Sequence, residues 1–195
     1  MLSIAIAQLN LTIGDFDANT AAVLDHMARA SGQGAQMVVF SELTLSAYYP
    51  ADLLEDAAFL RPMDAALQTV LQASTRWPAL VTVLGTARPN PGPGKPLHNA
   101  LLAIRNGQIV AEYYKQLLPT YGIFDEGRHF EAGPPVACTL DVAGHKVGFM
   151  ICEDGWNDEG RAYAINPFAS LQAAHPDLVV SINASPSDIG KRALR

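Results

Sequence analysis

Three side chains that could do chemistry together each follow an apolar run with the length of a buried strand. They are a carboxylate, an ammonium group and a thiol, carried by Glu42, Lys115 and Cys152. The run before the thiol, residues 147–151, is partly β-branched and stops at Cys152, as expected of a strand. In a sheet covered by helices, the carboxyl ends of the strands open onto the crevice that binds ligands. A base, a cation and a nucleophile could therefore gather at one edge.

This combination suits acyl transfer to a thiol. A thiol with an ordinary pKa is mostly protonated at pH 7, so it needs a base, and Glu42 can take its proton. Attack on an amide carbonyl places negative charge on oxygen, which Lys115 would stabilise together with the backbone N–H after the thiol. Lys115 would also balance the two acids that follow Cys152. From the residues alone a structural alternative stays open, because a buried cysteine is commonly a small hydrophobe and a lysine after a strand is commonly solvated.

Hydrophobic periodicity and breaker residues predict the elements that must position these groups. The first half reads as β-α-β-α-β, with one helix capped by Asn19 or Thr20 and two further helices separated at Pro62. The expected strands are 2–9, 35–40 and 80–86, and the expected helices run to about Ser31 and over 52–60 and 63–76.

The second half predicts two hairpins and a long functional loop. Asn106-Gly107 is a strong hairpin signal, and residues 116–135 form an irregular segment of the kind that often carries function. A helix over 158–174, interrupted at Pro167, precedes a last strand. The expected strands are 99–105, 108–114, 136–142, 146–151 and 178–182. Interleaved helices and hairpins indicate an α/β fold with mixed sheets.

Composition narrows the class of protein. The chain has 195 residues, 49% of them hydrophobic, enough for one domain with a sizeable core. A net charge of −6 without basic runs argues against nucleic acid and anionic membranes as partners. The start of the chain lacks a signal-peptide pattern, so we expect a cytoplasmic protein with both cysteines free. The histidines His98 and His129 stand alone, so no metal site is expected.

Three motifs, taken in order, resemble a known family. Ser41-Glu42-Leu43, Lys115-Gln116-Leu117-Leu118-Pro119 and Ile151-Cys152-Glu153-Asp154-Gly155-Trp156 are similar to the Glu-Lys-Cys signature of the nitrilase superfamily of carbon–nitrogen hydrolases. The resemblance covers nearly the whole chain. It implies an α-β-β-α sandwich in which Glu42 is the base, Lys115 stabilises the oxyanion and Cys152 is the nucleophile.

Within the superfamily, Tyr121-Gly122-Ile123-Phe124-Asp125-Glu126 with Arg128 and Phe130, and Ser185-Pro186 followed by Ile189-Gly190-Lys191, resemble the glutaminase domains of glutamine-dependent NAD⁺ synthetases. That resemblance implies glutamine as substrate and a Cys thioester as intermediate. It also implies substrate-binding roles for a second set of residues, of which Glu126 would orient Lys115 or the substrate amide: Tyr121, Glu126, Glu153, Ser185 and Lys191.

Several of these residues have a structural alternative. Glu126 could be a solvated carboxylate and Tyr121 could pack over the loop. Glu153 could pair with Arg128, and Asp154 could cap a helix starting a few residues later. We expect a structural role for Asp154 and core positions for Trp156 and Cys138.

The chain also departs from the subgroup. Ala47-Tyr48-Tyr49-Pro50 replaces a glycine-tyrosine-proline turn and could reshape the pocket wall beside Glu42, and Lys191 stands where arginine is often seen, which weakens a two-pronged grip on a carboxylate. We expect residues 1–195 to be an incomplete hydrolase domain, truncated at its C-terminus, with the ATP-dependent synthetase domain absent.

The partners and cofactors follow from this reading. The chain itself is expected to use no cofactor, ATP and Mg belonging to the missing synthetase domain, and to form a homo-oligomer. Two other functions stay open: a free-standing amidase or carbamoylase of the same superfamily, and an inactive truncated module that only binds a partner.

Overall fold

A five-stranded sheet with two helices on one face forms the first half of the molecule. The computed structural model describes residues 1–157 and 163–186. The sheet order is β1-β2-β3-β4-β5; β1, β2 and β3 run parallel, and β4 is antiparallel to both of its neighbours. The elements are β1 (Ile4–Ile6), α1 (Phe16–Gly32), β2 (Met37–Val39), η1 (Ala51–Glu55), α2 (Ala57–Ser74), β3 (Val81–Pro89), β4 (Leu97–Arg105) and β5 (Gln108–Tyr114).

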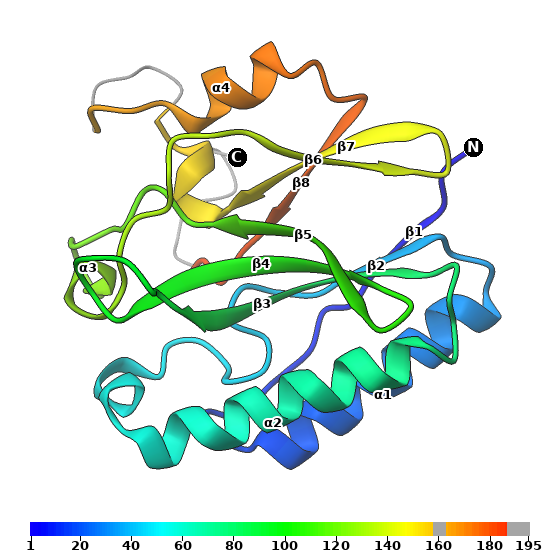
Figure 1. Ribbon diagram of the computed structural model, residues 1–195, viewed down its shortest axis with the longest axis horizontal. Helices are drawn as coiled ribbons and strands as arrows, with labels where there is room; N and C mark the ends of the chain where they lie inside the picture. Colours follow the sequence, from blue (N-terminus) through cyan, green and yellow to red (C-terminus); the bar gives the residue numbers. More distant parts are fainter. Residues whose placement is uncertain (158–162, 187–195) are drawn as a thin grey trace.

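A second sheet of three strands completes a layered sandwich. Its order is β6-β7-β8, with β6 antiparallel and β8 parallel to β7. Helices α1 and α2 cover the outer face of the first sheet, the second sheet lies on its other face, and α4 lies beyond the second sheet (Figure 1). The elements are α3 (Glu126–His129), β6 (Cys138–Val142), β7 (His145–Ile151), η2 (Cys152–Gly155), α4 (Pro167–Ala173) and β8 (Leu178–Ile182). The predicted α-β-β-α sandwich with mixed sheets is confirmed.

Side-chain alternation along the central strands divides the core in two. Successive residues of a strand point to opposite faces. Leu84 and Leu102 therefore pack under the helices, while Val83 and Leu101 pack against the second sheet. Because both faces are covered, the middle of β4, residues 100–104, is apolar at every position, which makes it easy to predict as a strand. No helix among the described residues is long and apolar enough to cross a membrane.

The start of the first helix was predicted wrongly. Helix α1 begins at Phe16, and its cap is Asp15, whose Oδ1 accepts the N–H of Ala18 at 3.1 Å. Asn19 is instead buried inside the helix and donates to the carbonyl of Leu45 at 3.1 Å. A polar residue one turn inside a helix was mistaken for its cap.

The expected break at Pro62 is also wrong. Helix α2 runs unbroken from Ala57 to Ser74, and the separation from η1 falls at Asp56, which caps α2 by accepting the N–H of Ala58 at 2.7 Å. Proline removes one helical hydrogen bond, to the carbonyl four residues earlier. Ala58 and Pro62 both face solvent, where that carbonyl can be hydrated.

The second half follows the prediction more closely. Both hairpins form at the expected turns, and Asn106 and Gly107 have φ values of 49° and 79°, which the tight turn requires. Pro167 begins α4, as expected of a proline in the first turn of a helix. Of the helix predicted over 158–174, residues 163–166 are not helical, and residues 158–162 lie outside the described ranges. Trp156 is 43% exposed, so its expected core position is wrong.

Candidate active site

The three residues singled out first lie at strand ends that face a common edge. Glu42 follows β2 and Lys115 follows β5, and these two strands point the same way because two antiparallel steps separate β5 from β3, which is parallel to β2. Cys152 follows β7 of the second sheet. The loop after β8 completes the site, because the backbone N–H of Ala184 donates to Glu42 Oε2 at 3.1 Å.

A glycine on β3 allows Glu42 to reach this position. Gly85 packs directly against the backbone of the segment after β2: a Cβ at this position would lie 2.4 Å from the backbone nitrogen of Leu43 and 2.8 Å from Cα of Glu42. Only a residue without a side chain permits this approach. The backbone N–H of Gly85 also donates to the carbonyl of Ser41 at 3.1 Å, which fixes the segment to the sheet.

Lys115 lies between two buried carboxylates. Its Nζ is 2.7 Å from Glu42 Oε1 and 2.8 Å from the Glu126 carboxylate, and all three side chains are at most 1% exposed. Burial lowers the pKa of Lys115, but the charges of Glu42 and Glu126 outweigh burial, so its pKa lies above the usual value. The ammonium group is therefore fully charged at neutral pH, as an oxyanion-stabilising group must be.

Glu126 is the second partner of Lys115 and is fully buried, so it is not a solvated carboxylate. Tyr48 donates its hydroxyl to Glu126 Oε1 at 2.8 Å. Burial raises the pKa of Glu126 to about 6; Lys115 acts to lower it and Glu42 to raise it. Of the two roles expected for Glu126, the contact with Lys115 is present. Tyr48 of the Ala47-to-Pro50 segment thus lies beside Glu126, and a reshaped pocket wall beside Glu42 stays a prediction.

Cys152 sits in a strained backbone conformation at the end of β7. Its φ is 45°, in the left-handed region that costs a residue other than glycine about 1–3 kcal/mol. Its Sγ lies 3.4 Å from Ser185 Oγ, and the side chain is mostly buried. Burial raises the pKa of the thiol, as does the charge of Glu42, whereas Lys115, Ser185 and the N–H of Ala184 lower it. The charges of Glu42 and Lys115 therefore both affect the pKa of the Cys152 thiol.

Glu42 is held by neutral donors as well as by Lys115. Asn99 on β4 is fully buried and donates from Nδ2 to Glu42 Oε1 at 2.8 Å. The Ala184 N–H binds the other oxygen and also acts on the thiol of Cys152. Glu42 Oε2 and the sulfur of Cys152 thus share one donor, the N–H of Ala184. This is the carboxylate oxygen to which the thiol proton could move.

A second group of polar residues forms around Glu153. The hydroxyl of Tyr121 donates to both oxygens of Glu153, at 3.0 and 2.9 Å, and that of Tyr163 donates to Oε1 at 2.8 Å. The Tyr121 ring is 55% exposed. Glu153 therefore binds tyrosines, and the alternative of a pair with Arg128 is wrong: Arg128 lies 3.2 Å from Asp52. Lys191 lies outside the described residues.

Asp154 has a structural role, as expected. Its carboxylate is fully buried and accepts hydrogen bonds from Tyr113, Gln116, Leu117 and Ile151, and among the described residues it caps no later helix. Cys138 lies at the start of β6, packs against the core between the sheets, and like Cys152 is a free thiol.

Sequence reasoning missed three contributors to the site: Asn99, Tyr163 and the backbone N–H of Ala184. Asn99 offered one signal, because it is a polar residue within the apolar run of β4 that reads LHNALLAIR. A backbone group such as the Ala184 N–H leaves no signal in residue type, since its role depends only on where the chain passes.

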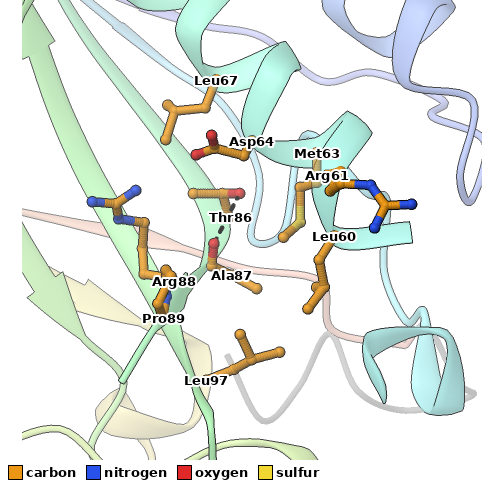
Figure 2. A pocket seen from close by; sticks show the side chains of 10 residues that line it. All are labelled: Leu60, Arg61, Met63, Asp64, Leu67, Thr86, Ala87, Arg88, Pro89 and Leu97. Atoms are coloured by element: carbon orange, nitrogen blue, oxygen red, sulfur yellow. Dashed lines mark hydrogen bonds between the residues drawn. The ribbon is translucent and has the colours of Figure 1, made fainter. Parts of the chain in front are cut away.

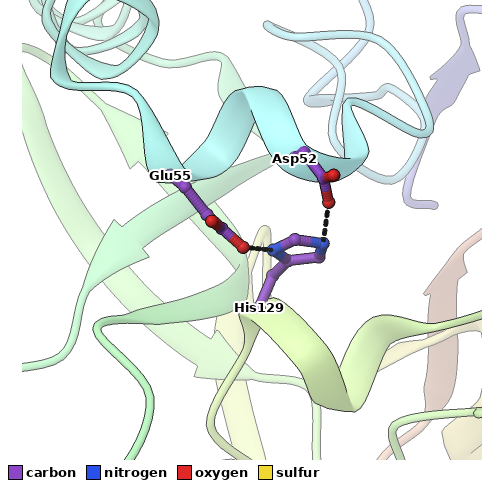
Figure 3. A group of neighbouring side chains, drawn as sticks. All are labelled: Asp52, Glu55 and His129. Atoms are coloured by element: carbon purple, nitrogen blue, oxygen red, sulfur yellow. Dashed lines mark ion pairs between the residues drawn. The ribbon is translucent and has the colours of Figure 1, made fainter.

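His129 lies between two carboxylates on η1, as Figure 3 shows. Its ring nitrogens are each 3.5 Å from an oxygen, Nε2 from Asp52 and Nδ1 from Glu55. The guanidinium of Arg128 lies 3.2 Å from the same Asp52 oxygen and 3.7 Å from the same Glu55 oxygen. Because Arg128 already supplies positive charge at these oxygens, we assign no metal to the cluster. The expected absence of a metal site stays a prediction.

A cavity of about 270 Å³ lies between α2 and the end of β3, lined mainly by apolar side chains such as Leu60, Met63 and Leu97 (Figure 2). Its wall includes Arg88, whose Nε binds Glu112 at 3.0 Å. The cavity lies on the helix-covered face of the first sheet and has no residue in common with the candidate site.

The chain is similar along its whole length to one part of much longer proteins. It is 35% identical to a glutamine-dependent NAD(+) synthetase of Synechocystis sp., and 34% identical to one of Aquifex aeolicus. Both matches cover 100% of this chain but only 36% and 32% of the relatives. The chain thus spans about a third of the length of these relatives.

Solved structures share the fold. The glutamine-dependent NAD+ synthetase from Acinetobacter baumannii matches with a TM-score of 0.85 and 30% identity, over 98% of this chain and 34% of that chain. An amidase of the nitrilase superfamily from Nesterenkonia AN1 matches with a TM-score of 0.81 and 23% identity, over 98% and 68% of the two chains. The protein-family model for carbon-nitrogen hydrolases matches residues 3–175 of the chain. By this match over most of its length, the chain belongs to the carbon-nitrogen hydrolase family.

Proposed function

We propose that the chain hydrolyses the side-chain amide of glutamine through a thioester on Cys152. The observation that carries the proposal is the buried contact of one ammonium group with two carboxylates beside a thiol. Lys115 Nζ lies 2.7 Å from Glu42 and 2.8 Å from Glu126, and the charges of Glu42 and Lys115 both act on Cys152. A reactive acyl-transfer site needs this set: base, fixed cation and nucleophile.

In the first half of the reaction, Glu42 accepts the thiol proton of Cys152, and the sulfur attacks the amide carbon. A C–S bond forms, and the carbonyl electrons move to oxygen, where the Lys115 ammonium stabilises the negative charge. The carbonyl then re-forms, the C–N bond breaks, and Glu42 returns the proton to the departing nitrogen. Ammonia and a γ-glutamyl thioester are the products.

In the second half, Glu42 takes a proton from water, and the resulting hydroxide attacks the thioester carbon. The C–S bond breaks, glutamate leaves, and the proton returns to sulfur. Lys115 stabilises the same oxygen in both halves, so a rigidly held ammonium serves each step without rearrangement. The ion pairs with Glu42 and Glu126 hold the ammonium group of Lys115 in place.

The glutamine specificity rests on similarity to glutamine-dependent NAD(+) synthetases along the whole chain. We assign Tyr121, Glu153 and Ser185 to the substrate pocket, because they lie at or near the thiol: Ser185 Oγ is 3.4 Å from Cys152 Sγ, and Tyr121 binds the residue next to Cys152. Lys191 remains a prediction for the α-carboxylate. The acids and hydroxyls of this pocket suit a polar, zwitterionic substrate.

We extend the proposal to the longer protein that the relatives represent. There the ammonia would pass to a synthetase domain that uses ATP and Mg to amidate deamido-NAD. This part rests on similarity to the synthetases, of which the chain spans about a third.

The test compares Cys152→Ala with Cys138→Ala, the matched change at the other free cysteine. We expect Cys152→Ala to abolish glutamate release and Cys138→Ala to retain it. Undiminished glutamate release by Cys152→Ala would end the proposal. A panel of other amides distinguishes glutamine from the substrates of a free-standing amidase: faster turnover of a simple aliphatic amide would replace glutamine while keeping the chemistry.

A further inference from the structure

Asp154 joins the two segments that carry the cation and the nucleophile. Its Oδ1 accepts the backbone N–H groups of Gln116 and Leu117, at 3.0 and 2.8 Å. Its Oδ2 accepts the hydroxyl of Tyr113 at 2.8 Å and the backbone N–H of Ile151 at 3.2 Å. Three of these donors lie within two residues of Lys115, and the fourth directly precedes Cys152.

The carboxylate also closes the turn on which the thiol sits. The bond from the Ile151 N–H to Asp154 spans Cys152, whose φ of 45° is in the strained left-handed region. Such strain persists only where the surroundings hold it. A single buried carboxylate therefore fixes both the backbone of the nucleophile and the strand end that presents Lys115.

Only an ionised carboxylate can do this. Two oxygens receive four donors, and an amide would have one oxygen to accept and an NH₂ group facing further donors. Burial raises the pKa of Asp154 to about 6, while the donors Leu117, Tyr113 and Ile151 lower it. The group is therefore mostly ionised at neutral pH although it is fully buried. Its four hydrogen bonds go to Tyr113, Gln116, Leu117 and Ile151 rather than to the carboxylates that contact Lys115.

We propose that Asp154 is a positioning residue that sets the distance and orientation of Lys115 relative to the sulfur of Cys152. The inference rests on the proposed function, in which Lys115 must contact the oxyanion of the substrate while the carbon that carries this oxygen is bonded to that sulfur. A misplacement of about 1 Å can lower an enzymatic rate about 100-fold. Loss of Asp154 should therefore lower kcat while substrate binding changes little.

The experiment uses the 195-residue chain with Cys138→Ser, which leaves Cys152 as its single cysteine, so that alkylation reports on one thiol. Three variants are compared: Asp154→Asn, Tyr113→Phe and the control Asp141→Asn, which removes an exposed carboxylate from β6. The measurements are kcat and KM for glutamine, the pH dependence of Cys152 alkylation by iodoacetamide, and thermal unfolding. Tyr113→Phe removes one donor but keeps the Asp154 charge.

We expect Asp154→Asn to lower kcat about 100-fold with little change in KM, and Tyr113→Phe to lower kcat less. In both, the alkylation profile should move to higher pH, because Lys115 lowers the thiol pKa and is no longer aligned. Asp141→Asn should match the parent.

An unchanged kcat and an unchanged alkylation profile in folded Asp154→Asn would overturn the inference, as would a change in stability alone. If Asp154→Asn does not fold, Tyr113→Phe decides in the same way. Alkylation needs no substrate, so the two proposals can fail separately. If the parent protein does not hydrolyse glutamine but the alkylation profiles of the variants are shifted, the proposed function is refuted and the role of Asp154 stands.

Discussion

Removal of the Lys115 ammonium tests whether the site is as dry and as tightly paired as the structure shows. Lys115→Met keeps the length of the side chain but leaves Glu42 and Glu126 buried without their cation. In the wild type Nζ lies 2.7 and 2.8 Å from these carboxylates, and all three side chains are at most 1% exposed. Removing one partner of a buried ion pair costs about 3–5 kcal/mol, because the remaining charge is uncompensated.

This loss is large for a domain whose total stability is about 5–15 kcal/mol. For 150–250 residues each kcal/mol corresponds to about 2–4 °C in Tm, so Lys115→Met should lower Tm by about 6–20 °C. The sign of the pH dependence follows from the carboxylates. Burial raises the pKa of Glu126 and Lys115 lowers it, so loss of the ammonium raises the folded pKa of Glu126 further and protonation favours the folded state. The deficit should therefore shrink as pH falls toward 5 and grow as pH rises to 8.

The assay is urea unfolding of Lys115→Met, of Lys115→Met/Glu126→Gln, and of Lys95→Met as the matched change at an exposed lysine. The double variant removes one of the two stranded charges and should regain about 1–3 kcal/mol. Lys95→Met should be close to wild type. A Lys115→Met deficit below about 1 kcal/mol, or one that does not vary with pH, would refute a dry ion-paired site.

Three further predictions address separate parts of the site. Because the pKa of Glu126 is raised to about 6, glutamine hydrolysis should fall as pH drops through about 6, and a pH–rate profile of Glu126→Gln should lack this acid limb. The free energy of unfolding should fall as pH rises from about 4.5 through 6, because the folded state binds this proton more tightly than the unfolded state. Asn99→Leu removes the buried donor to Glu42 and should lower kcat about 10-fold or more, measured by steady-state kinetics; unchanged kcat would show that Lys115 alone orients the carboxylate. Gly85→Ala forces a Cβ to 2.4 Å from backbone and should cost about 1–3 kcal/mol by denaturation, whereas Gly32→Ala, with nothing within 4 Å, should not destabilise; equal effects would contradict the close approach.

Much of the fold could be predicted because burial on both faces gives strands such as β4 a continuous apolar stretch, here residues 100–104. The turn at Asn106-Gly107 and the strand Leu178–Ile182 were located for equally local reasons. Helix starts were predicted less well. Asn19 and Pro62 have the residue types of a cap and a breaker, but each lies inside a helix, where tertiary contacts or solvent satisfy the groups involved.

The site was predictable where chemistry depends on residue type at a strand end, as for Glu42, Lys115 and Cys152. The partners that hold these residues were not predictable. The donors to Asp154 come from two separate segments, and one donor to Glu42 is a backbone N–H in the loop after β8. Such contacts depend on how the chain passes in space, for which local sequence carries no pattern.

The central claim is that Glu42 and Lys115 act together on the sulfur of Cys152. Rapid acid quenching after mixing with glutamine, followed by mass spectrometry of the peptide that contains Cys152, measures acyl transfer to that sulfur directly. We predict one γ-glutamyl group on Cys152 in the wild type and none in Glu42→Gln or Lys115→Met over the same interval. Equal acylation in either variant, or a γ-glutamyl group on a different residue, would contradict the claim.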